Sequence, residues 1–127
     1  MSMRLTPIIE GNDAGETLVF LQGWPDDASL WDDAVRALAP THRCVRVNMP
    51  GYEEGSPPPR WGYTTEEIVS ALTEHVKSIA HGKRVTLILH DWGSYWGHAV
   101  HHRIPDLVSR VVGLDVAPHF KPRMGEA

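Results

Sequence analysis

Short apolar runs separated by polar segments dominate the pattern of this 127-residue chain. The runs are rich in β-branched residues and apolar at nearly every position, which is typical of strands covered on both faces of a sheet. A further segment, Leu5–Glu10, could form an edge strand, although Pro7 disfavours a strand there. The four strands predicted from the apolar runs are Thr17–Leu21, Cys44–Asn48, Val85–Leu89 and Val111–Val116.

Helical spacing of apolar residues marks two of the segments between these runs. Asp27 or Ser29 can cap the first helix, and Thr64 with Glu67 forms a capping box at the start of the second, which Gly82 is expected to end. The apolar stripes are Trp31, Val35 and Leu38 in the first helix, and Ile68, Leu72, Val76 and Ile79 in the second.

The order of these segments predicts the fold class. Strand and helix alternate from Thr17 onward, so we expect an α/β fold, a mostly parallel sheet with helices on both faces. The segment Met49–Tyr63, which contains three consecutive prolines, is predicted as an irregular loop. No repeat or break in composition divides the chain, so residues 1–127 are interpreted as belonging to one domain.

The most informative segment is the end of the strand Val85–Leu89. It runs directly into His90-Asp91-Trp92-Gly93, and a helical pattern follows to about Arg103. This order places Asp91 on a sharp turn between a strand and a helix, where the helix N-terminus favours an anion. The same kind of turn presents the nucleophile of the G-x-S-x-G elbow. The alternative interpretation of Asp91 is a residue that caps the helix.

Three motifs in order resemble one known family. They are Leu18–Pro25, which ends in a strand-to-loop Gly-Trp-Pro turn, Asn48–Tyr52, and His90–Gly93. Together they resemble the α/β-hydrolase superfamily, in particular its epoxide hydrolase and haloalkane dehalogenase branch. The similarity runs from about Thr17 to Pro122. It implies an α/β-hydrolase fold of which this chain is the N-terminal half, with the cap and the last strands missing.

The resemblance also implies a site and a reaction. Asp91 would be a nucleophile that forms an alkyl ester with a small, largely apolar electrophile, with no cofactor and no metal. The backbone amides of Trp24 and Trp92 would form the oxyanion hole. Gly23, Pro25, His90 and the Trp92 side chain would line the substrate pocket.

Several positions differ from the family pattern. Gln22 stands where the family usually has His, Asn48 where it has Asp, and Leu89 where the elbow prefers a small residue. Trp24 replaces the Asn of the dehalogenases, which favours an epoxide hydrolase-like pocket; haloalkane dehalogenation remains the alternative. Pro118 lies where some dehalogenases carry their acid. Tyrosines 52, 63 and 95 are further candidates for lining the pocket.

A catalytic base and its acid are not evident. Three histidines of the helix after Asp91 lie roughly 10 Å or more along it, which excludes them as its base. His98 and His102, at i and i+4, could hold a metal together with the nearby His101, but a solvated polar face is the simpler interpretation. His119 is a weak candidate for the base, and Asp106 and Asp115 are read as turn and strand residues. The three helical histidines are His98, His101 and His102. We therefore expect these 127 residues to be inactive alone; a non-catalytic relative that binds a small ligand or a partner is the alternative.

Composition limits the kinds of partner and the cellular location that the sequence suggests. Lys plus Arg is 12 and Asp plus Glu is 16, a net charge of −4 without a basic cluster, which argues against a nucleic-acid partner. The one cysteine, Cys44, cannot form an internal disulfide, and the sequence shows neither a signal peptide nor a transmembrane run. A cytoplasmic protein is predicted.

The strand Val111–Val116 would leave a sheet edge uncovered, so self-association is expected.

Overall fold

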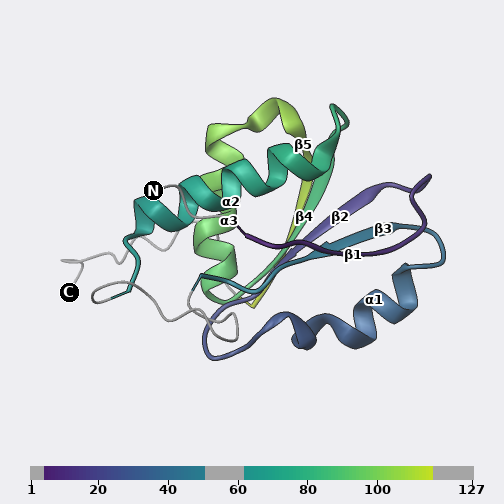
Figure 1. Ribbon diagram of the computed structural model, residues 1–127, viewed down its shortest axis with the longest axis horizontal. Coiled ribbons are helices and arrows are strands. Elements are labelled where there is room, and N and C mark those ends of the chain that lie inside the picture. Colours follow the sequence, from purple (N-terminus) through teal and green to yellow (C-terminus); the bar gives the residue numbers. More distant parts are fainter. Residues whose placement is uncertain (1–4, 51–61, 116–127) are drawn as a thin grey trace, which may run out of the picture.

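A five-stranded sheet forms the centre of the protein (Figure 1). The computed structural model describes residues 5–50 and 62–115. Along the sheet the strand order is β1-β3-β2-β4-β5; β1 pairs antiparallel to β3 and every other pair is parallel. The strands are β1 (Ile8–Gly11), β2 (Thr17–Leu21), β3 (Arg43–Arg46), β4 (Val85–His90) and β5 (Val108–Leu114).

Helices cover both faces of this sheet. The helical elements are the 3₁₀ turn η1 (Ala28–Trp31), α1 (Asp32–Leu38), α2 (Thr65–Ala80), α3 (Trp92–Arg103) and the 3₁₀ turn η2 (Pro105–Leu107). Figure 1 shows α1 on one side of the sheet and α2 and α3 on the other. The mostly parallel sheet with helices on both faces confirms the predicted fold class.

Two apolar clusters result from the alternation of side chains along the strands. In β2, Val19 and Leu21 belong to the larger cluster under α2 and α3, whereas Leu18 and Phe20 belong to the smaller one under α1. Cys44 is fully buried in the smaller cluster, and its burial raises the pKa of its thiol. The cysteine therefore acts as a small core residue.

The ends of the helices lie close to the positions predicted from the local sequence, with differences at the start of the first helix and at the end of α2. Asp27 caps η1 by accepting a hydrogen bond from the amide of Ser29 at 2.9 Å, so this helix starts with a 3₁₀ turn. Thr64 accepts one from the amide of Glu67 at 3.1 Å, as predicted. α2 ends at Ala80, and the two residues after it, His81 (φ 52°) and Gly82 (φ 75°), are both left-handed, so Gly82 takes part in ending the helix together with His81.

The strand boundaries differ from the apolar runs. β5 begins at Val108, three residues before the predicted start, and ends at Leu114, because the polar residues Ser109 and Arg110 join its ladder with β4. Asp115 therefore lies after the strand and not inside it, with a φ of 65°. β1 and β3 are likewise shifted from the predicted Leu5–Glu10 and Cys44–Asn48. Apolar runs indicate burial, whereas backbone pairing sets the strand ends.

One histidine of α2 is an unusual core residue. His75 is 4% exposed, and neither ring nitrogen has a hydrogen-bond partner among the described residues. Burial lowers the pKa of its imidazole to about 4. The ring is therefore neutral in the folded protein at neutral pH.

No helix within residues 5–50 and 62–115 is long and apolar enough to span a bilayer.

Candidate active site

The carboxyl ends of three neighbouring strands bring the candidate residues together. β4 lies between β2 and β5 and is parallel to both, with Leu21 opposite Leu89 and His90 opposite Leu114. The segments that follow these strands therefore begin at the same end of the sheet. Ligands bind at this carboxyl end of the strands in open α/β sheets.

Asp91 occupies a strained turn between β4 and α3. Its φ is 55° and its ψ is −131°, a backbone conformation that residues other than glycine rarely adopt. α3 starts at the next residue, Trp92. The strand-turn-helix elbow predicted from the sequence is thus present in the structure.

The carboxylate of Asp91 is directed to the loop after β2. Its Oδ2 accepts a hydrogen bond from the backbone N–H of Trp24 at 3.0 Å, a contact between residues 67 positions apart. The side chain makes no capping hydrogen bond to α3; only its backbone carbonyl accepts from Ser94, at 2.9 Å. Asp91 thus occupies the N-cap position of α3, as the alternative interpretation has it, but its carboxylate contacts the Trp24 amide instead of capping the helix.

Gly23 allows the two segments to approach. A Cβ atom at this position would overlap the Oδ2 of Asp91 and lie 2.5 Å from the backbone nitrogen of Trp92. The amide of Trp92 and the carboxylate of Asp91 thus pack directly against the backbone of Gly23, beside the amide of Trp24. Only glycine fits here without displacing one of these groups.

We expect Gly23→Ala to lower the free energy of unfolding by about 2 kcal/mol, the typical cost of overpacking. The hydrogen bond between Trp24 and Asp91 should be lost, because backbone atoms must move. Urea denaturation and the amide proton shift of Trp24 measure the two effects. Gly82→Ala is the control for the Trp24 shift: its Cβ would meet no atom within 4 Å, so this variant loses stability only through the positive φ of residue 82 and should leave the Trp24 shift unchanged. An unchanged Trp24 shift in Gly23→Ala would contradict the close packing.

Gln22 and Asn48 hold the loop that carries Trp24. Gln22 is fully buried; its Nε2 donates to the carbonyl of Val47 at 2.8 Å, and its Oε1 accepts from the indole of Trp31 at 3.0 Å. Asn48 Oδ1 accepts from the amide of Ala28 at 2.9 Å. Both side chains that depart from the family pattern thus make hydrogen bonds that fix the segments around this loop.

The third departure, Leu89, is accommodated by a glycine on the facing helix. Leu89 is completely buried, and a Cβ atom at Gly97 of α3 would overlap its terminal methyl groups. One helical turn earlier, a Cβ atom at Gly93 would overlap the carbonyl oxygen of Leu21. The two glycines let α3 lie close to the sheet even though Leu89 is bulky.

Aromatic side chains surround the elbow and are open to solvent. Trp24 is 69% exposed and Trp92 51% exposed. The Trp92 ring contacts Tyr95 edge-on, with centroids 5.6 Å apart, and stacks on Trp96 at 6.0 Å. Pro25 is exposed beside Trp24, and Tyr63 is partly buried against the larger core cluster. The elbow thus has an apolar, aromatic border.

A histidine–carboxylate pair at the same end of the sheet was missed by the sequence analysis. His90 Nε2 lies 3.5 Å from Asp115 Oδ2, while its Nδ1 is buried without a hydrogen-bond partner among the described residues. Asp115 was read as a strand residue. A carboxylate that follows the end of a strand, next to a strand that ends in a histidine, was the available signal.

The remaining candidates are not brought to the elbow. His98, His101 and His102 follow Asp91 along α3, so the helix carries them away from it. Within the described ranges, no group of three His, Cys, Asp or Glu side chains could hold a metal ion. Asp106 lies in η2. Gly51, Tyr52, Pro118 and His119 lie outside the described residues.

Comparison with known proteins agrees with this geometry. Residues 16–124 match the family described as alpha/beta hydrolase fold. The chain is 31% identical over 121 residues to epoxide hydrolase 2 of Caenorhabditis elegans, covering 93% of this chain and 33% of that protein. It is 34% identical over 93 residues to a probable oxidoreductase of Mycobacterium tuberculosis, covering 72% of this chain and 16% of that protein. An epoxide hydrolase structure from Vigna radiata superposes with a TM-score of 0.81 at 26% identity, over 97% of this chain and 39% of that one.

The chain belongs to the α/β-hydrolase fold family. Within that family it is similar to the epoxide hydrolase-like branch. It spans 33% or less of the two curated relatives and 39% of the solved structure.

Proposed function

We propose that this chain is the N-terminal part of an epoxide hydrolase-like enzyme in which Asp91 is the nucleophile. The observation that carries the proposal is the hydrogen bond from the Trp24 amide to the carboxylate of Asp91 on a strained elbow. This contact turns the carboxylate away from the helix and fixes its orientation. A substrate of small size and apolar character fits the aromatic border.

The hydrogen bond assigns different roles to the two carboxylate oxygens. Oδ2 is held by the Trp24 amide, which leaves Oδ1 to attack a carbon of the substrate. In an epoxide, the bond from Oδ1 to carbon forms as the ring C–O bond breaks, and the released alkoxide takes a proton from water, which leaves hydroxide in the solvent. The product is an alkyl ester of Asp91, with Oδ2 as its carbonyl oxygen.

Hydrolysis of this ester uses the same amides. Attack of water on the carbonyl carbon of this ester places negative charge on Oδ2, which the N–H of Trp24 already contacts. The N–H of Trp92, the first residue of α3, is proposed as the second donor. Each such donor contributes about 2.7–4 kcal/mol to an oxyanion in related sites. The step also needs a base. The α3 histidines lie away from Asp91, and the ring of His90 is directed to Asp115. We therefore expect the ester to accumulate in a polypeptide of these 127 residues.

Exposure to a reactive epoxide tests the proposal. Intact-mass measurement should show one added substrate mass, and peptide mapping should place it on Asp91. An adduct on Cys44 or on a histidine, or no adduct at all, would overturn the assignment of the nucleophile.

The same experiment separates the alternatives. A haloalkane dehalogenase would form the ester with an alkyl halide and release halide, whereas a non-catalytic relative would form no adduct with either reagent.

The lone cysteine is free and buried, which supports a reducing compartment such as the cytoplasm.

Self-association through β5 is the partner interaction that we propose. β5 is an edge strand of the sheet, and its Val112 and Leu114 are 42% and 41% exposed. Unpaired edges with apolar side chains favour pairing with another chain.

We expect Val112→Lys to raise the dissociation constant of self-association about tenfold, because a charge on an edge strand opposes pairing. Sedimentation velocity over a concentration series measures this. Ala37→Lys on the exposed face of α1 adds the same charge away from β5 and should have no effect. A concentration-independent monomer would exclude the interaction.

A further inference from the structure

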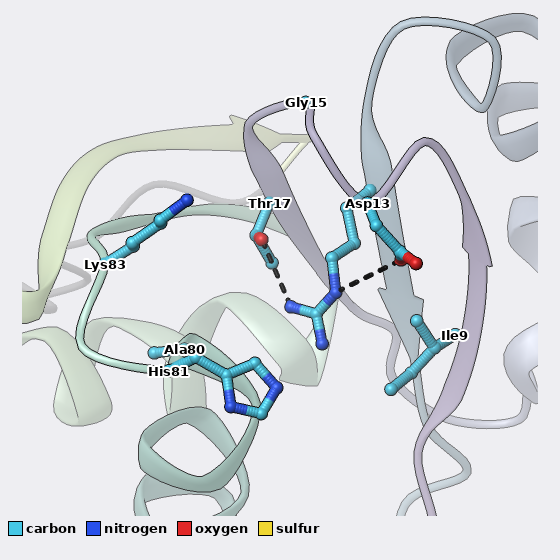
Figure 2. A pocket seen from close by; sticks show the side chains of 8 residues that line it. Ile9, Asp13, Gly15, Thr17, Ala80, His81 and Lys83 are labelled. Atoms are coloured by element: carbon cyan, nitrogen blue, oxygen red, sulfur yellow. Dashed lines mark hydrogen bonds and ion pairs between the residues drawn. The ribbon is translucent and has the colours of Figure 1, made fainter.

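A pocket lies at the end of the sheet where the parallel strands begin, whereas Asp91 lies at the end where they finish. Its volume is about 370 Å³. Thr17 and Arg43, the first residues of β2 and β3, line it together with Lys83, which precedes β4 (Figure 2). These are the amino ends of parallel strands, whereas Asp91 follows a carboxyl end. The pocket is therefore separate from the candidate active site.

A buried cation forms part of the pocket wall. The side chain of Arg43 is only 9% exposed. Its Nη1 donates to Thr17 Oγ1 at 3.2 Å and to the carbonyl of Ile79 at 2.7 Å, which satisfies one carbonyl at the end of α2. Both acceptors are neutral, so these bonds position the guanidinium without neutralising its charge.

The carboxylate that faces Arg43 is a weak partner. Asp13 Oδ1 lies 4.0 Å from Arg43 Nε, at the outer limit of an ion pair, and the Asp13 side chain is 91% exposed. Buried charges in proteins are normally paired at close range, because their desolvation is costly. The charge of Arg43 thus remains available to a second anion in the pocket.

Other lining residues define what such an anion would look like. Lys83 and His81 lie across the pocket from Asp13 and Ile9 (Figure 2). Ile9 is 45% exposed and provides an apolar wall. With about 30 Å³ for each water molecule, this volume corresponds to about twelve waters, which leaves room for an organic group beside an acidic one.

We propose that this pocket binds a small organic anion, a carboxylate or a phosphate monoester. Its acidic group pairs with Arg43 and Lys83, as fork-shaped guanidinium groups and lysines do with such anions. Its apolar part lies against Ile9. The site is independent of Asp91 and of the reaction proposed for it.

Titrations followed by amide chemical shifts test the site. The probes are benzoate and phenyl phosphate, with inorganic phosphate and the neutral benzyl alcohol for comparison. We expect saturable shifts at Gly15, Thr17, His81 and Lys83, with a dissociation constant of about 1 mM that rises with salt. The stronger of the two aromatic anions identifies the acidic group. No saturation at tens of millimolar, or equal binding of benzyl alcohol, would overturn the proposal.

Two exposed residues should change the affinity in opposite directions. Lys83→Gln should weaken binding about threefold to fivefold, and Asp13→Asn should strengthen it by a similar factor, because Asp13 competes with the ligand for Arg43. Lys77→Gln, on α2 beside Glu74, makes the same change of charge away from the pocket and should leave the affinity unchanged. These variants avoid Arg43, whose loss would also disturb the end of α2. If Lys83→Gln and Asp13→Asn both behave like Lys77→Gln, the pocket is not an anion site.

Discussion

Asp91→Asn is expected to abolish formation of the covalent adduct with a reactive epoxide. A neutral amide is a poor nucleophile, so the rate of alkylation at this position should fall by at least about 100-fold. The fold should persist. Asparagine tolerates a positive φ about as well as aspartate, and its side-chain oxygen can still accept the hydrogen bond from the Trp24 amide.

A matched variant separates this effect from a general loss of carboxylates. Asp106→Asn removes an exposed carboxylate in η2 and should leave the yield of adduct unchanged. Circular dichroism checks that both variants are folded. Equal alkylation of Asp91→Asn and the parent protein would mean that the elbow carboxylate is not the reacting group.

His75→Leu is expected to stabilise the protein increasingly as the pH falls from 6.5 to 4. Burial lowers the pKa of His75 from about 6.5 to about 4, so in this range the unfolded chain takes up a proton that the folded protein does not. Above pH 6.5 His75 does not make the free energy of unfolding depend on pH. Between pH 6.5 and pH 4 it lowers that free energy by up to about 1.4 kcal/mol for each pH unit, and below pH 4 there is no further change. The total difference is about 3 kcal/mol.

At pH 7 the leucine variant should already be somewhat more stable. Both ring nitrogens of His75 are buried without partners among the described residues, and an apolar side chain of similar size removes that cost. Urea denaturation of the two proteins between pH 7 and pH 4 measures the difference. Leu72→Met repacks the same helix without a titratable group and should run parallel to the parent protein. Parallel curves for His75→Leu would show that the ring is hydrated in the folded state.

Local features of the chain were readily predicted. The apolar stripe of α2 and its Thr64 cap follow from side-chain spacing and from hydrogen bonds within one turn. The elbow at Asp91 was predicted for the same reason, since an apolar run that ends in polar residues and a helical pattern describes a strand, a turn and a helix. Each of these features depends on residues that are close in sequence.

The ends of the strands could not be predicted as well from the sequence. The polar residues Ser109 and Arg110 belong to β5 because they pair with β4, although nothing in their chemistry indicates a strand. The position of Asp115 beside His90 follows from the same register. A pattern of apolar residues records burial, but hydrogen bonding to a neighbouring strand decides where a strand begins.

The sequence by itself determined the α/β fold, the main helices and the residue at the tip of the elbow, because spacing and turn chemistry are local properties. Only the tertiary structure decided what that residue contacts. The carboxylate of Asp91 meets the amide of Trp24, Leu89 fits against Gly97, and Arg43 is buried beside Asp13. These contacts join segments brought together by strand order and register, and no local pattern specifies that arrangement.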